Sequence, residues 1–200
     1  MLRSILSRRF IAGWAAGILS SAAVAVGVAV WMIFGGGFDA SASKQHLRPV
    51  AWASHTAMRN WVKKQAKDVR PPESFTQAHV KAGAREYEQR CIACHGGPAV
   101  PRAKWASGMI PTPPYLIDTS RHWSAAELYV IVHDGIKMTA MPAWGELEPD
   151  DNLWNVVAFL EALPGMSSDE FARMRAEVSA PSPVNPGGGS DLVSSAPFTR

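Results

Sequence analysis

Two cysteines and a histidine within five consecutive residues constrain this chain more than any other feature of its sequence. Cys91 and Cys94 lie about one helical turn apart, His95 follows directly, and the chain of 200 residues has no other cysteine. This C-x-x-C-H spacing is typical of covalent attachment of a c-type haem, because two such thiols can each add to a different vinyl group of one porphyrin. The adjacent imidazole can then bind the iron from the proximal side.

Three other interpretations of the motif agree less well with the sequence. A redox-active dithiol of the thioredoxin kind belongs in a βαβ context, whereas the residues around Cys91 have a helical pattern. A structural zinc site usually needs four nitrogen or sulfur ligands, and the sequence has no second C-x-x-C and no suitably spaced histidine pair. A disulfide between Cys91 and Cys94 leaves the adjacent His95 unexplained. The motif therefore predicts one covalently bound haem c.

The second axial ligand of the iron stays open on the residues alone. Iron bound by one histidine commonly takes methionine, histidine or no protein ligand on its other side. The candidates downstream of the motif are Met109, His122, His133, Met138, Met141, Met166 and Met174. Pro142 biases Met141 to an extended conformation, and a stiff loop can hold a thioether at a fixed distance from iron. Met138 competes with Met141, whereas His122 and His133 lie in contexts typical of the surface.

These features together resemble the class I c-type cytochromes, and in particular the bacterial membrane-anchored members with one haem. The similarity covers about residues 78 to 166 and includes the C-x-x-C-H motif and a later Met-Pro-Ala-Trp segment. In that family the methionine of the Met-Pro step is the distal ligand of the iron. The resemblance therefore implies His95 and Met141 as the two axial ligands.

The same resemblance implies an all-α fold, in which loops wrap around the haem of a class I cytochrome c domain. The family has a glycine and an aromatic residue four positions apart in its first helix, matched here by Gly83 and Tyr87. An aromatic-Leu pair in the last helix crosses them, and Phe159-Leu160 matches that pair.

Apolar residues on both sides of the Met-Pro segment are candidates to line the haem pocket. These candidates are Pro101, Trp105, Tyr115, Leu116, Ile131, Ile136, Met138, Pro142, Trp144 and Trp154. For Trp105, Tyr115 and Leu116, ordinary packing is an equal alternative. Pro98 and Pro101 are candidates to place a carbonyl beside the second ring nitrogen of His95, because a ligand histidine usually has such a partner.

An uncharged run of 24 residues, from Ile11 to Phe34, follows an N-terminus that contains three arginines. Its length suits a helix that spans a bilayer, and the basic N-terminus predicts a cytoplasmic start with the rest exported. A cleaved signal peptide is the alternative, because residues 40–42 have a small-x-small pattern, although signal peptides usually have shorter apolar cores. We expect an uncleaved, single-pass anchor in a bacterial inner membrane, with the haem domain in the periplasm.

The sequence divides into four segments of different charge and regularity. Residues 1–42 form the stub and anchor, residues 43–77 a basic tether with a helix from about Ser54 to Lys67, residues 78–166 the cytochrome domain, and residues 167–200 a short helix and a disordered tail. The tether has a net charge of +5 and can contact anionic headgroups, dock on a partner subunit or act as a solvated spacer. The cytochrome domain has a net charge of −3, so nucleic-acid binding has no support there.

Local signals predict the helices of the cytochrome domain. A capping box at 74–77 starts a first helix that reaches about Cys94, and a second capping box at 124–127 starts a helix that Gly135 stops. A last helix over about 151–163 ends at Pro164-Gly165. The acidic residues before it, from Glu146 to Asp151, favour the N-terminus of that helix, and an acidic docking patch is the alternative.

The function expected from these observations is a membrane-tethered electron carrier with one haem, and not an enzyme. It would pass single electrons between respiratory-type redox partners and have no small-molecule substrate, because His95 and Met141 fill both axial positions. One alternative is a haem c subunit fixed within a larger oxidase or dehydrogenase. The other is a small haem peroxidase or sensor in which Met141 is displaceable.

Overall fold

A computed structural model describes residues 8–37 and 39–179 of the chain, and this part is helical. The only β-type pairing within the described residues is an isolated bridge between Gly97 and Val100, so the predicted all-α class is confirmed. The chain divides into two compact units, Met1–Ala42 and Ser43–Arg200.

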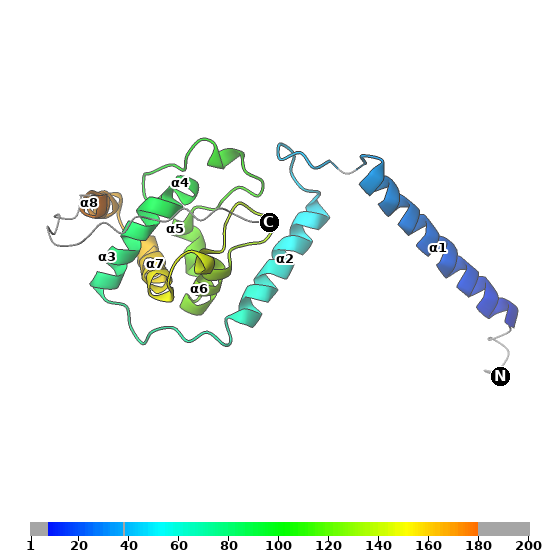
Figure 1. Ribbon diagram of the computed structural model, residues 1–200, viewed down its shortest axis with the longest axis horizontal. Helices are drawn as coiled ribbons and strands as arrows, with labels where there is room; N and C mark the ends of the chain where they lie inside the picture. Colours follow the sequence, from blue (N-terminus) through cyan, green and yellow to red (C-terminus); the bar gives the residue numbers. More distant parts are fainter. Residues whose placement is uncertain (1–7, 38, 180–200) are drawn as a thin grey trace, which may run out of the picture. The chain divides into compact units, whose positions relative to one another are not determined.

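Eight α-helices occur in the described ranges, joined by loops and short turns (Figure 1). They are α1 (Arg8–Phe34), α2 (Arg48–Gln65), α3 (Gln77–Glu86), α4 (Ile92–His95), α5 (Leu116–Thr119), α6 (Ala125–Asp134), α7 (Asp150–Ala162) and α8 (Ser168–Ser179). A π-helical turn, η2 (Tyr87–Cys91), joins α3 to α4. The 3-10 turns are η3 (Ala106–Gly108), η4 (Ser120–His122), η5 (Trp144–Glu146) and η6 (Leu163–Gly165).

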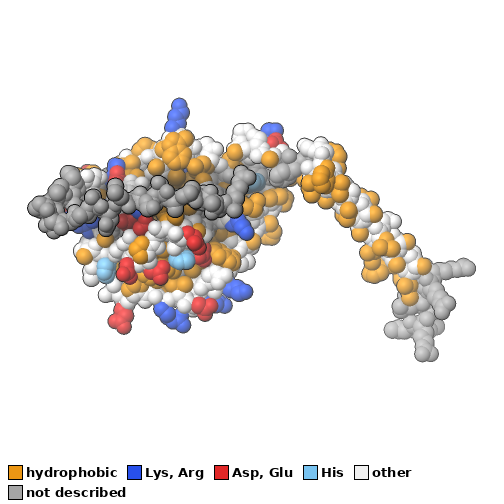
Figure 2. Space-filling view, viewed as in Figure 1, with side chains coloured by type: hydrophobic (Ala, Val, Ile, Leu, Met, Phe, Trp, Pro, Cys, Tyr) orange, Lys and Arg blue, Asp and Glu red, His pale blue; other side chains and the backbone are white. Residues whose placement is uncertain are grey.

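Helix α1 makes up most of the first unit. Its residues Phe10–Phe34 have a mean hydropathy of 2.1, and by length and composition they are sufficient to cross a membrane. Apolar side chains, orange in Figure 2, lie exposed along this helix. A signal sequence near an N-terminus meets the same criteria, so these properties do not distinguish an anchor from a signal.

The core of the second unit is built where α3 packs against α7. A Cβ atom on Gly83 would lie 1.8 Å from the carbonyl oxygen of Asn155, so the absence of a side chain lets the two backbones approach closely. One turn later the Tyr87 ring lies 4.9 Å from the Phe159 ring, centroid to centroid. The structure therefore contains the crossing of the first and last helices that the resemblance implies.

Helix α6 covers another side of α7, and its ends are as predicted. Ser124 and Glu127 form the expected capping box, in which each side chain accepts the backbone N–H of the other residue. Gly135 ends the helix with a φ of +63°, a conformation that glycine adopts without strain. Leu128 and Val132 of α6 are buried in the core.

The start of the first cytochrome helix differs from the prediction. The N-cap is Thr76 and not Ser74: the Thr76 hydroxyl accepts the N–H of His79, and His79 Nδ1 accepts the N–H of Thr76 at 3.1 Å. An imidazole thus replaces the carboxylate or amide that a capping box usually has at this position. The helix also does not reach Cys94 in one regular form, because the π turn η2 interrupts it; such turns frequently lie at functional sites.

Helix α2, in the segment predicted as a basic tether, packs on α6 within the second unit. It starts at Arg48, earlier than predicted, because the first helical turn accommodates Pro49. Val62 is fully buried, and the Arg59 guanidinium lies 4.9 Å from the centre of the Trp123 ring. Towards its N-terminus, α2 leaves Trp52 exposed.

Helix α8 lies beyond the end predicted for the cytochrome domain, yet it contributes to the same core. Phe171 is buried there, and a Cβ atom on Gly97 would lie 2.3 Å from its ring. Arg175 donates two hydrogen bonds to Glu88 of η2, at 2.6 and 2.7 Å. The predicted disordered tail, residues 180–200, lies outside the described residues.

Candidate haem site

The C-x-x-C-H motif lies where η2 passes into the short helix α4. Both thiols are free and half-buried. Burial raises the pKa of the Cys91 thiol to about 12, against the lowering effect of the neighbouring Arg90. Cys91 is therefore a neutral thiol before any bond to a cofactor forms. It packs, with Ile92, against the core that α3, α6 and α7 build.

His95 has the partner expected of an iron ligand, but a different residue supplies it. The Nδ1 atom of His95 lies 2.8 Å from the carbonyl oxygen of Pro114. The expectation that Pro98 or Pro101 supplies this carbonyl is therefore wrong. The physical reason is that the loop after the motif folds back on α4, with the N–H of Ala103 donating to the carbonyl of Ala93 at 2.8 Å, so that a later loop segment reaches the ring.

The hydrogen bond to Pro114 fixes which nitrogen of His95 is available to a metal. A carbonyl oxygen only accepts hydrogen bonds, so Nδ1 carries the proton and the lone pair lies on Nε2. Burial, and to a smaller extent the charge of Arg102, lowers the pKa of His95, while the bond to Pro114 opposes this. The ring is thus held as a neutral imidazole, which is the form that binds iron.

Arg102 lies next to this arrangement and was not anticipated from the sequence. Its guanidinium lies 3.9 Å from the centre of the Tyr115 ring, and its Nε is buried without a hydrogen-bond partner in the described part of the chain. Gly96 makes the close packing possible, because with a φ of +63° a Cβ there would lie 2.8 Å from the Tyr115 ring. An arginine in a Pro-rich loop gives no local signal of such a position.

The two competing methionines lie in very different surroundings. Met138 is 90% exposed and has a φ of +61°, whereas Met141 is partly buried and packs against the core that Cys91 also contacts. The Met141 N–H donates to the Thr139 hydroxyl at 3.1 Å, and the Met141 carbonyl accepts from Ile136 N–H at 3.3 Å. These bonds hold the backbone of Met141 and leave Met138 free of the core.

The remaining pocket candidates divide into two groups. Four pack against the same core or are half-buried near it: Leu116, Trp144, Trp154 and Ile136. Ile131 is also half-buried, while Pro101, Trp105, Tyr115 and Pro142 are exposed. The histidines considered as ligands have other surroundings: His122 is exposed, and His133 pairs with Asp134 at 2.7 Å.

The residues present fit a covalently bound haem. Two free thiols and a neutral imidazole with its lone pair on Nε2 lie within five residues, where η2 passes into α4, and the half-buried Met141 thioether packs against the core that Cys91 also contacts. Within residues 8–37 and 39–179, no three His, Cys, Asp or Glu side chains come together as a site for a metal ion. The zinc interpretation of the cysteine pair therefore gains no support.

A comparison with protein families gives the same result for this part of the chain. Residues 78–160 match the family described as cytochrome C oxidase, cbb3-type, subunit III. The matched range begins at α3 and includes the C-x-x-C-H motif, Met141 and nearly all of α7. Residues 78–160 therefore form a c-type cytochrome domain, and its cofactor is a covalently bound, iron-containing haem c.

Proposed function

We propose that the chain is a membrane-tethered cytochrome with one haem that transfers single electrons through an iron bound by His95 and Met141. In this proposal Cys91 and Cys94 hold the porphyrin through thioether bonds. The observation that supports it best is the hydrogen bond from His95 Nδ1 to Pro114, because it presents Nε2 as a ready-made ligand. The burial of Met141 against the core supports a second ligand from the chain.

The chain's own residues then limit what the site does. Haem iron supplies one-electron exchange between its ferric and ferrous states. If His95 and Met141 both hold the iron, they would leave no position on it for a substrate, so these two residues favour electron transfer over catalysis at the iron. Thioether ligation favours the ferrous state and raises the reduction potential. The core around Tyr87 and Phe159 is closely packed, so it reorganises little when the charge changes.

The ligand assignment is tested by comparing two variants of the haem-loaded protein. Met141→Ala should abolish the thioether-to-iron absorption band of the ferric protein and lower the reduction potential, because the iron loses its sulfur ligand. Met138→Ala is the matched control, since Met138 is exposed, and it should change neither. If Met138→Ala removes the band and Met141→Ala does not, the assignment is wrong.

A second candidate function is a haem c subunit fixed within a larger oxidase. The printed description of the matched family, subunit III of a cbb3-type oxidase, favours this candidate. Extraction in mild detergent, followed by purification of the tagged full chain, distinguishes the two. Stoichiometric co-purification of other subunits supports a fixed subunit, whereas a chain that elutes alone with its haem supports a tethered carrier.

A third candidate function is a small peroxidase or gas sensor, and the binding of carbon monoxide tests it. Carbon monoxide added to the native ferrous protein should give no spectral change if Met141 closes the sixth position. Rapid formation of a carbon monoxide complex would favour a displaceable Met141 and hence a sensor or peroxidase.

The proposed periplasmic location of the haem domain rests on the basic N-terminus before α1.

A further inference from the structure

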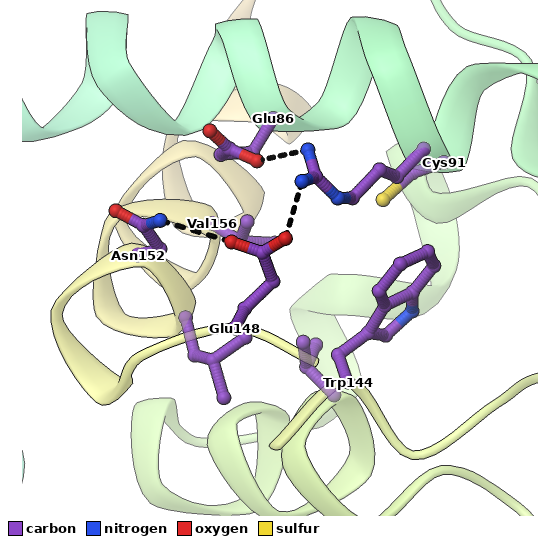
Figure 3. Close-up of a pocket in the computed structure, with 9 residues that line it drawn as sticks. Glu86, Cys91, Trp144, Glu148, Asn152 and Val156 are labelled. Carbon is purple, nitrogen blue, oxygen red and sulfur yellow. Dashed lines mark hydrogen bonds and ion pairs between the residues drawn. The ribbon is translucent and has the colours of Figure 1, made fainter. Parts of the chain in front are cut away.

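Arg90 and Cys91, the first haem-binding cysteine, line the same pocket, in which Arg90 pairs with the carboxylates of Glu86 and Glu148. Figure 3 shows these two carboxylates and Cys91. The Arg90 guanidinium contacts Glu86 at 2.5 Å, one helical turn back, and also pairs with Glu148, which is 58 residues away in sequence. Asn152 of α7 donates to the other oxygen of Glu148 at 3.0 Å. The guanidinium lies 5.9 Å from the centre of the Trp144 ring. One arginine thus joins η2 to the segment before α7.

The segment that Arg90 contacts is the one that follows Met141. The N–H groups of Leu147 and Glu148 both donate to the carbonyl of Trp144 at 2.9 Å, which makes a compact turn around η5. Trp144 is only three residues beyond Met141. A displacement of the Glu148 side chain would therefore also shift the Met141 backbone, because only a short stretch of chain with internal hydrogen bonds joins the two residues.

The pairing is sheltered enough to contribute measurably to the position of this segment. The side chains of Arg90, Glu86 and Glu148 are 29%, 19% and 15% exposed, so solvent screens them less than an open surface pair. Removing the cation would leave two half-buried carboxylates facing each other, which is unfavourable. Separation of the Glu148 segment from η2 would relieve that repulsion, and the same movement would draw Met141 away from the core.

We propose that Arg90 is a positioning residue that holds the 141–148 segment against η2, the turn that ends at Cys91, and so controls how readily Met141 leaves the iron. This inference rests on the proposed ligation by His95 and Met141. Arg90 contacts neither ligand in the structure, and it acts through Glu148 and the η5 turn. The first pairing, with Glu86, fixes the guanidinium on η2, and the second, with Glu148, fixes the distal segment to it.

The test is the affinity of the ferric, haem-loaded full chain for imidazole, which competes with Met141 for the sixth position. Arg90→Gln should bind imidazole about tenfold more tightly than the unaltered chain, which corresponds to about 1.4 kcal/mol. Glu148→Gln should show a similar gain, and the double variant should add little to either, because both changes break the same contact. Arg90→Lys should lie in between, since an ammonium group lacks the fork that binds two carboxylates.

Arg175→Gln is the matched control. Arg175 is 35% exposed and pairs with Glu88, two residues from Arg90 in η2, but it ties this turn to α8 and not to the distal segment. Thermal unfolding of all variants reports general loss of stability. The inference predicts that Arg175→Gln lowers the unfolding temperature while imidazole affinity stays within about twofold, since its pairing does not reach the 141–148 segment.

Two outcomes overturn the inference while leaving the proposed function intact. One is an imidazole affinity of Arg90→Gln equal to that of the unaltered chain. The other is an equal gain in Arg90→Gln and Arg175→Gln, which would indicate general loosening. Absence of the thioether-to-iron band in the unaltered chain contradicts the proposed ligation itself, so the two failures are distinguishable. If Arg90→Gln does not fold, Glu148→Gln and Arg90→Lys still give the comparison.

Discussion

At the scale of single residues, Gly83 is the position where a one-atom change should matter most. Gly83→Ala would place a Cβ 1.8 Å from the carbonyl oxygen of Asn155, which is backbone and has no room to rotate away. Overpacking of this kind forces α3 and α7 apart, and we expect a loss of at least about 3 kcal/mol in the free energy of unfolding. Gly108→Ala is the control, because nothing lies within 4 Å of its added Cβ. Urea unfolding of the haem-loaded protein measures both, and equal midpoints would contradict the close approach.

The hydrogen bond of the Tyr87 hydroxyl provides a second prediction at the scale of residues, because its acceptor directly follows the C-x-x-C-H motif. The hydroxyl donates to the Gly96 carbonyl at 2.7 Å in a buried position, and burial raises its pKa, so it remains a donor. Tyr87→Phe leaves that carbonyl unsatisfied and should reduce the free energy of unfolding by about 1–3 kcal/mol. Tyr129→Phe removes an exposed bond of the same length, to Asp150, and should cost less. A larger loss in Tyr129→Phe would argue against this ranking.

The residues that the sequence failed to reveal share one property. The contact of His95 with Pro114 joins positions 19 apart, and that of Arg90 with Glu148 joins positions 58 apart. Such pairs depend on how loops fold back, and neither motif spacing nor periodicity encodes that. The sequence alone could propose Cys91, Cys94 and His95 as haem-binding residues because a short motif contains all of their chemistry, whereas the choice of Met141 over Met138 as a ligand needed the family resemblance.

At the scale of elements, the sequence predicted best the helices whose ends have local signals. Helix α6 lies between a Ser-x-x-Glu capping box and a glycine, and the structure has both boundaries as predicted. Helix α7 runs from Asp150 to Ala162, one residue from the predicted range at each end. The starts of α2 and α3 were misplaced because their signals are unusual, a proline in the first turn and an imidazole in a capping box.

Helix α2 provides the element-scale prediction, because its role depends on tertiary contacts that periodicity could not reveal. Val62→Ala removes two methyl groups from a fully buried position of α2, the helix that packs on α6. At about 0.8 kcal/mol per buried carbon, plus the cavity left behind, we expect a loss of about 2 kcal/mol in the free energy of unfolding. Val50→Ala, at a half-exposed position of the same helix, should change it by less than about 0.5 kcal/mol. If α2 is a solvated spacer, the two variants will unfold alike.

At the scale of the whole molecule, the cytochrome core includes helices that lie outside the residues covered by the sequence motifs. The family match ends at residue 160, yet α8 buries Phe171 and Val178 in the same core, and α2 covers α6 from the other end of the sequence. Both flanking helices are amphipathic but contain many charged residues, so the sequence pattern did not show that their apolar faces pack on the cytochrome core. The basic stretch over residues 43–77 is therefore only in part a linker between α1 and the cytochrome core.

The positively charged residues 43–77 and the apolar helix α1 could each attach the chain to a membrane. Washing with concentrated salt distinguishes these two kinds of attachment. Electrostatic contact with anionic lipids is screened at about 1 M salt, where the Debye length is about 3 Å, whereas an inserted apolar helix is not released. We predict that the full chain stays in the membrane fraction after washes in high salt and in alkaline carbonate, because α1 contains an apolar segment of 25 residues, Phe10–Phe34.

The control for this prediction is a chain in which a cleavable signal peptide replaces residues 1–42, so that export and haem attachment are retained. Without α1 this chain keeps its +5 stretch, and high salt should release it completely. Intact mass of the unaltered protein completes the comparison, since an uncleaved anchor keeps all 200 residues. A haem-containing product that begins at residue 43 and dissolves without detergent would show that the apolar helix is a signal, and the tethered carrier would then be a free one.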